Sequence, residues 1–118
     1  MYKDSQEFVK QLEGSSITHI TFMNDYLAIG FNIGALTAVI PPTILKGNKM
    51  WGWRRSGYND NIISLIQTNV TSVVLNENEK YLKLILENKV EILLSWNNPP
   101  KNVTEAFILK INDDVLII

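Results

Sequence analysis

The sequence contains no cysteine and only one histidine, His19, and these shortages exclude several kinds of site. Without cysteine the chain has no disulfide, no thiolate metal site and no cysteine nucleophile. Without a second histidine, a metal site of the usual type is not expected, and a serine nucleophile would depend on His19 as its base. We therefore predict no catalytic residues, no metal and no cofactor, and we expect a protein that is not an enzyme.

Long apolar runs are also missing. No stretch approaches the roughly 18 uncharged apolar residues that a membrane span needs. The first residues, Met1 to Gly14, are polar and amphipathic and lack the apolar core of a secretion signal. With 118 residues, of which 46% are hydrophobic, the chain is predicted to form one globular domain over residues 1–118. We expect it to be cytoplasmic, with no membrane partner.

The clearest structural pattern runs from Val70 to Trp96. Apolar residues recur at every second position from Tyr81 to Leu86 and again from Val90 to Trp96. This alternation is typical of strands with one buried face. The segments 76–79 and 87–89 contain asparagine, which favours tight turns. The stretch is therefore predicted to form three antiparallel strands in sequence, with Lys83 and Glu91 able to pair on the opposite face.

Three further apolar runs precede this stretch. Ile17 to Met23 and Tyr26 to Phe31 flank Asn24-Asp25, which suits a two-residue hairpin turn. Gly34 to Ile40 is a third strand-like run, and Pro41-Pro42 ends it because proline donates no backbone hydrogen bond. After the central stretch, Glu105 to Ile118 reads as a last hairpin about residues 112–114, with a closing VLII run apolar enough to be buried.

Two short helices are expected among the strands. Asp4 or Ser5 is suited to cap a helix that ends near Gly14, and Asn59 or Asp60 is suited to cap a second. The strands are joined by turns and not by helical crossovers, which disfavours a parallel sheet. The predicted fold class is therefore α+β, mainly antiparallel β-sheet arranged as a sandwich or half-barrel, with two short helices.

Charge is unevenly distributed along the chain. The net charge is only −1, but no acidic residue lies between Asp25 and Asp60. That interval holds the four basic residues Lys46, Lys49, Arg54 and Arg55. We expect one basic loop on an otherwise acidic body.

The segment Thr43 to Gly57 loses all periodicity and is predicted to be a long loop or a hairpin with an irregular tip. Its second half contains most of the most distinctive octet of the chain, WGWRRSGY at residues 51–58. Tryptophan, tyrosine and arginine are enriched at protein-binding hot spots, and the same types can stack on bases and meet phosphates. A structural alternative has one tryptophan closing the end of the sheet while the arginines lie over it. The low overall positive charge makes nucleic acid an unlikely partner.

From Ile17 onward, the order of elements resembles small bacterial immunity proteins of polymorphic or contact-dependent growth-inhibition toxin systems. The residues that carry this resemblance are the opening hairpin, the aromatic octet, NDNIISLIQTNVTSVVL, YLKLILENKVEILLS and TEAFILKI. It implies a cytoplasmic protein that binds one cognate toxin domain, often a nuclease, and blocks its active site or substrate groove. The resemblance supplies no motif from which binding residues can be transferred.

An acidic body suits electrostatic attraction of a basic nuclease, which raises the association rate. The acids expected to act lie at the tips of predicted turns, and the aromatic octet supplies the other contacts. The predicted partner-binding residues are Trp51, Trp53, Arg54, Tyr58, Glu77, Glu79, Asp113 and Asp114. A small nucleic-acid-binding or regulatory domain that uses Trp53, Arg54 and Arg55 remains the alternative function.

Overall fold

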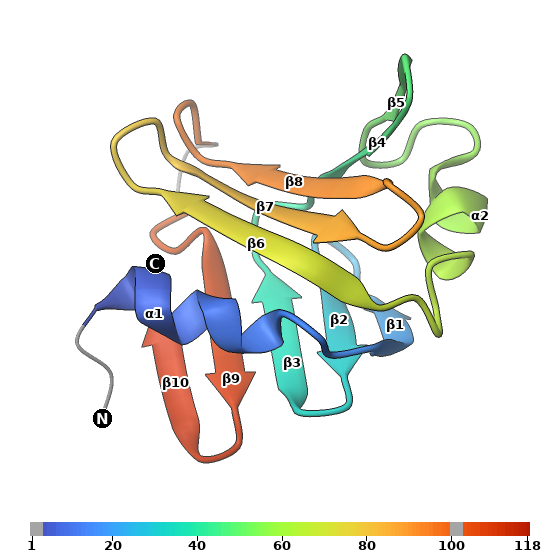
Figure 1. Cartoon of the computed structure of the whole chain (residues 1–118). Coiled ribbons are helices and arrows are strands. Elements are labelled where there is room, and N and C mark those ends of the chain that lie inside the picture. Colours follow the sequence, from blue (N-terminus) through green and yellow to red (C-terminus); the bar gives the residue numbers. More distant parts are fainter. Residues whose placement is uncertain (1–3, 100–102) are drawn as a thin grey trace.

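Two five-stranded antiparallel sheets make up most of the structure, a computed structural model that describes residues 4–99 and 103–118. The first sheet has the strand order β1-β2-β3-β9-β10, and the second has the order β5-β4-β8-β7-β6. The sheets face each other across a common core, with α1 along one side and α2 at one end (Figure 1). The predicted α+β fold class, mainly antiparallel with two short helices, is confirmed.

The strands of the first sheet are β1 (Ile17–Phe22), β2 (Leu27–Phe31), β3 (Gly34–Ala38), β9 (Phe107–Ile111) and β10 (Asp114–Ile117). The strands of the second sheet are β4 (Thr43–Lys46), β5 (Lys49–Trp51), β6 (Val70–Asn76), β7 (Tyr81–Leu86) and β8 (Glu91–Ser95). The helices among the described residues are α1 (Ser5–Val9), continued by the short 3-10 turn η1 (Lys10–Leu12), and α2 (Tyr58–Ile63).

The second sheet contains the three-stranded unit expected between Val70 and Trp96. Strands β6, β7 and β8 pair in sequence, and Lys83 lies 3.5 Å from Glu91 on the outer face, as predicted. The first part of the segment that lost periodicity is a hairpin with a tight tip, because β4 and β5 join at Gly47-Asn48 with Lys46 opposite Lys49. Residues 52–57, which follow β5, belong to no strand or helix. This hairpin projects beyond the rest of the sheet (Figure 1).

The prediction that the closing VLII run is buried is wrong. Val115 and Ile117 are 53% and 59% exposed, whereas Leu116 faces the core beside Leu109. The reason is the position of β10, which pairs with β9 on one side only and forms an edge of the first sheet. Alternate side chains of such a strand point away from the core.

The helices differ in how closely they match the sequence. Asp4 caps α1 as expected, since its side chain accepts a hydrogen bond of 2.8 Å from the Glu7 backbone N–H. The second helix begins earlier than predicted: its N-cap is Gly57 and not Asn59 or Asp60. Gly57 adopts a φ of 88°, a conformation that glycine reaches without strain, and no side chain caps this helix.

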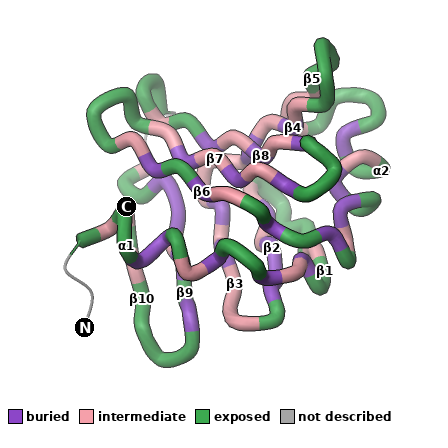
Figure 2. The backbone as a smooth tube through the Cα atoms, in the orientation of Figure 1, coloured by how far each residue is buried: buried purple, intermediate pink, exposed green. Residues whose placement is uncertain are grey.

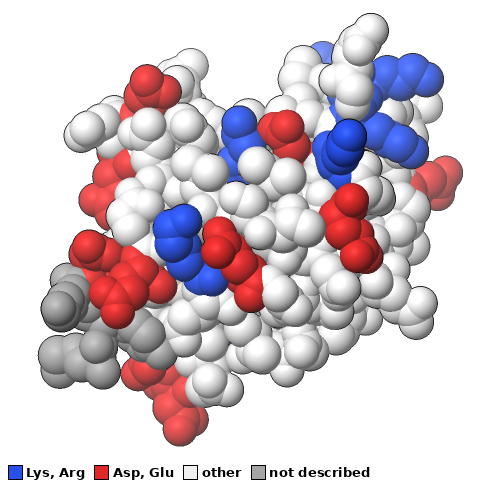
Figure 3. Space-filling view, in the orientation of Figure 1, with Lys and Arg blue, Asp and Glu red and all other residues white. Residues whose placement is uncertain are grey.

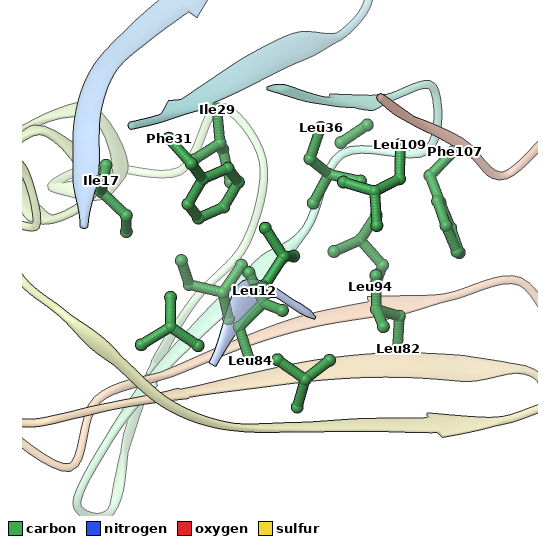
Figure 4. Close-up of a cluster of buried hydrophobic side chains, with 14 of the residues drawn as sticks. Leu12, Ile17, Ile29, Phe31, Leu36, Leu82, Leu84, Leu94, Phe107 and Leu109 are labelled. Atoms are coloured by element: carbon green, nitrogen blue, oxygen red, sulfur yellow. The ribbon is translucent and has the colours of Figure 1, made fainter. Parts of the chain in front are cut away.

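The inner faces of the two sheets form one apolar layer. Buried positions alternate with exposed or half-buried ones along the strands, as the tube in Figure 2 shows. In the close-up, Ile29 and Phe31 of the first sheet lie across from Leu84 of the second, and Leu12 lies between the sheets (Figure 4). This packing fixes which side chains remain on the two outer faces.

Candidate functional site

The aromatic octet connects β5 to the first turn of α2. Tyr58, its last residue, is fully buried, and its hydroxyl donates a 2.7 Å hydrogen bond to the backbone carbonyl of Pro42. Burial raises the pKa of the Tyr58 hydroxyl well above its ordinary value, because the charged form loses its hydration. Tyr58 is therefore not available as a surface contact, contrary to the expectation that its ring meets a partner.

Trp53 and Arg54 are packed against this buried ring. The Trp53 ring is 5.6 Å from that of Tyr58 in an edge-to-face arrangement, and the Arg54 guanidinium lies 5.6 Å above the Trp53 ring. Arg54 also donates a hydrogen bond to the Asn24 carbonyl and lies 4.0 Å from the Asp25 carboxylate. The octet is thus tied to the β1–β2 turn. Trp53 and Arg54 both make contacts within the chain that occupy part of their surfaces.

Trp51 is half-buried and belongs to the same cluster. Its indole nitrogen lies 3.1 Å from the point where a β-carbon on Gly57 would stand, so that any larger residue at Gly57 would press on the indole ring. Trp51 and Trp53 both pack against the core. These contacts favour the structural role weighed from the sequence, although both tryptophans are only half-buried.

The basic interval of the sequence forms one corner of the molecule. We call it the basic corner, and its members are Lys46, Lys49, Arg54 and Arg55, all exposed. Figure 3 shows lysine and arginine side chains gathered around the β4–β5 hairpin, with most acidic side chains elsewhere on this face. Met50, in the middle of β5, adds an apolar side chain that is 69% exposed.

The predicted acidic residues fall at two separate turns. Glu77 and Glu79 lie in the β6–β7 turn of the second sheet, whereas Asp113 and Asp114 lie in and beside the β9–β10 turn of the first. Figure 1 places these turns far apart. The eight predicted contact residues therefore do not form one surface.

The β6–β7 turn meets the start of α1. Asp4 and Glu77 line a common hollow, and Gln6 donates its side-chain amide to the Leu75 carbonyl at the end of β6. We call the acids gathered here the acidic corner. Its members are Asp4, Glu7, Glu77 and Glu79, all exposed. Lys80 is the one exposed base within this turn.

A shallow groove next to the acidic corner was not predicted from the sequence. It encloses about 630 Å³ on the outer face of the second sheet. Its lining consists of Asn78, Glu79, Lys80, Tyr81, Lys83, Leu93, Ser95 and Asn97. Tyr81 lies directly opposite Ser95, and Lys83 opposite Leu93, so that the floor of the groove comes from paired residues of β7 and β8.

The charges at this groove are mixed, since its lining holds one carboxylate, Glu79, and two ammonium groups, Lys80 and Lys83. Lys83 is already paired with Glu91 at 3.5 Å and lies 5.8 Å from the Tyr81 ring. Neither Glu79 nor Lys80 has a salt-bridge partner among the described residues. An aromatic and aliphatic floor beside a free carboxylate can hold a long basic side chain, whose stem packs on the floor while its charge meets Glu79.

Within residues 4–99 and 103–118, no three histidine, aspartate or glutamate side chains gather closely enough to hold a metal ion. None of the described helices has the length and apolar character required to cross a bilayer. Comparison with protein-family models, curated proteins and solved structures finds no significant match. Any functional assignment therefore rests on the surfaces described above.

Proposed function

We propose that the chain is an immunity protein: a cytoplasmic, non-enzymatic inhibitor that binds a cognate toxin domain, such as a nuclease, and blocks its active site. The observation that carries the proposal is the groove on the second sheet, which combines an apolar floor with the unpaired carboxylate of Glu79. This surface has the composition of a protein-binding site, namely an aromatic anchor with a polar rim.

The acidic corner supports the choice of a basic partner. Glu77 and Glu79 lie at a projecting turn, where their charges act on an approaching molecule with little competition from neighbouring bases other than Lys80. Nuclease domains present cationic surfaces because their substrates are polyanions. An acidic rim would therefore draw such a domain toward the groove and raise the association rate.

The aromatic octet has a smaller direct role in this proposal. Trp51, Trp53 and Arg54 expose only part of their side chains, since the cluster around Tyr58 holds the remainder. They lie at the end of the second sheet that is opposite Glu79, where the basic corner adjoins the exposed side chain of Met50. A toxin that spans the sheet from Glu79 to this end would meet both corners.

Nucleic-acid binding through Trp53, Arg54 and Arg55 is the less favoured alternative. A base stacks on an aromatic ring only where one face of the ring is open. Arg54 lies over the Trp53 ring and is held by Asn24 and Asp25, so that this ring and this charge are already partly used. Arg55 alone of the three has no side-chain contact of this kind among the described residues.

The proposal predicts that a toxic C-terminal domain is encoded immediately upstream, and it is tested by co-expressing the chain with that domain. We expect cells to survive and the two proteins to co-purify as a 1:1 complex. Glu79→Lys, which places a like charge at the rim, should reduce both survival and recovery of the complex. Lys110→Glu, on the outer face of the first sheet, is the control for a charge reversal away from the groove and should change neither. Cell death without complex formation would refute the immunity role, and an oligonucleotide titration of tryptophan fluorescence would then test the alternative.

A further inference from the structure

Sheet edges are sites where unpaired backbone groups can recruit another chain, and proteins usually protect them. The two sheets have four edges: β1 and β10 in the first, β5 and β6 in the second. The edges differ in how they are protected from pairing with another chain, and β10 is the least protected of them.

The β6 edge is covered by the N-terminal segment, which bonds to several of its outward backbone groups. The Gly14 N–H donates to the Val70 carbonyl, and the Val70 N–H donates to the Ser15 carbonyl. Farther along, the Val73 N–H donates to the Glu13 carboxylate at 2.9 Å, and the Leu75 carbonyl accepts from Gln6. A helix and its following turn therefore close this edge to other strands.

The β1 and β5 edges carry other protections. A bulge interrupts β1 between Ile17 and His19, and the backbone of Ile17 bonds to Gln67 and Thr68. Strand β5 is only three residues long and begins with Lys49. Bulges, short strands and lysine are devices that discourage edge pairing.

Among the described residues the β10 edge has no bulge, no lysine and no covering segment, and at four residues it is one residue longer than β5. Ile118 and Phe107 exchange backbone hydrogen bonds of 3.1 and 3.3 Å. In an antiparallel pair, hydrogen-bonded residues alternate with residues that do not bond across the pair, so Leu116 also bonds to β9 whereas Val115 and Ile117 do not. This alternation directs the N–H and carbonyl groups of Val115 and Ile117 away from β9. No hydrogen bond from residues 4–99 or 103–118 reaches them. The same two residues carry the most exposed aliphatic side chains of the first sheet.

We propose that this edge pairs with β10 of a second copy of the chain, which joins two first sheets into one continuous antiparallel sheet. A twofold axis through Leu116 places Val115 opposite Ile117 of the second copy. In this register the outward backbone groups of both residues meet one another, and their exposed side chains share the outer face. Leu116 meets its own counterpart on the core face. Backbone and side-chain requirements are thus met by a single register.

The proposed dimer leaves the candidate functional site accessible. The groove lies on the outer face of the second sheet, whereas β10 is an edge of the first. Each copy would then present its own groove. The inference does not depend on what the groove binds.

The absence of cysteine makes a register-specific test possible. In Leu116→Cys the two thiols face each other across a pair whose Cα atoms are about 4.5 Å apart, within disulfide reach. In the control Val115→Cys, the two thiols are offset by about 7 Å along the strand in addition to the strand spacing, beyond that reach. We expect Leu116→Cys to form a disulfide dimer under mild oxidation. Val115→Cys should form no disulfide dimer although its site is more exposed.

Sedimentation of the unmodified chain gives an independent measurement. The average mass should rise from that of one chain toward that of two between about 10 µM and about 1 mM, since an interface this small is weak. Val115→Pro should abolish the rise, because the N–H that it removes points away from β9 and serves no bond within the chain. A constant monomeric mass up to about 1 mM, or equal oxidation of both cysteine variants, would overturn the proposal. Protection of the β10 amides only in a toxin complex would likewise overturn it and assign the edge to a toxin strand.

Discussion

At the residue scale, Tyr58 shows how one side chain organises the distinctive part of this sequence. It is the largest of the fully buried side chains, and its ring supports Trp53 while its hydroxyl satisfies the carbonyl of Pro42. Pro42 lies directly before β4, so that the hydrogen bond links α2 to the start of the projecting hairpin. Tyr58 therefore anchors the octet to the core.

Replacing Tyr58 with phenylalanine isolates the role of that hydroxyl. The variant keeps the ring but leaves a buried carbonyl without its donor, which should lower the free energy of unfolding by about 1–2 kcal/mol. Urea denaturation followed by tryptophan fluorescence measures the change. Tyr26→Phe, at a surface turn, is the matched control and should be neutral. Equal stability of Tyr58→Phe and the unmodified chain would show that the hydrogen bond contributes nothing.

The raised pKa of Tyr58 adds an alkaline signature to the same comparison. Above a pH of about 10 the unfolded chain releases this proton while the folded chain retains it, so that stability falls by at most about 1.4 kcal/mol per pH unit from this group. Below that pH the contribution is fully present. The curve for Tyr58→Phe should therefore be flatter than that of the unmodified chain in alkaline solution, because the other tyrosines and the lysines are common to both.

At the scale of elements, α1 with η1 acts as a cover for β6 and not as an independent helix. Glu13 takes part in this cover, because its carboxylate accepts the hydrogen bond of the buried Val73 N–H. The same carboxylate oxygen, Oε2, also lies 3.7 Å from the Lys10 ammonium in an exposed ion pair. The two interactions can be distinguished by mutation.

We expect Glu13→Ala to lower the free energy of unfolding by about 1.5–3 kcal/mol, the cost of leaving a buried donor without a charged acceptor. Lys10→Ala removes only the surface ion pair and should cost less than about 1 kcal/mol. Thermal or urea unfolding compares the variants, and hydrogen exchange at the Val73 amide reports on the edge itself. Equal costs for both variants would mean that the ion pair, and not the cover over β6, supplies the stability.

Elements with a clear periodic pattern were predictable from the sequence, and those without one were not. Strands β7 and β8 alternate because one face is buried, and they lie where expected. The start of α2 was missed because Gly57 caps it through backbone conformation, which leaves no side-chain signal. The exposure of β10 was missed because apolarity alone does not reveal that a strand is at an edge.

The candidate site was also only partly predictable from the sequence. The residues of the octet are neighbours in sequence, and so their clustering around Tyr58 was partly foreseeable. The groove is different, because Tyr81 and Ser95 come together only through the pairing of β7 with β8. The local pattern of apolar residues identifies each strand, but it does not show which outward-facing side chains of two paired strands lie next to each other.

At the scale of the whole molecule, the main feature is the separation of charge. The basic corner contains four cations near the β4–β5 hairpin, and the acidic corner contains four carboxylates near the β6–β7 turn. The net charge of −1 conceals this arrangement. A molecule of this kind orients an approaching charged partner more than it attracts it at long range.

Charge reversal at the acidic corner tests whether this orientation serves toxin binding. The double variant Glu77→Lys/Glu79→Lys should slow association with a basic toxin domain roughly tenfold at low ionic strength, with a much smaller effect at about 0.5 M salt. Asp113→Lys/Asp114→Lys makes the same change in net charge at the distant β9–β10 turn. Stopped-flow fluorescence across a salt series compares them. A partner seated at the groove predicts the larger effect from the first pair, because Glu79 lines that groove while the second turn lies on the other sheet. Equal slowing by both pairs would indicate attraction by net charge alone, and unchanged rates in both would remove the electrostatic account of partner recognition.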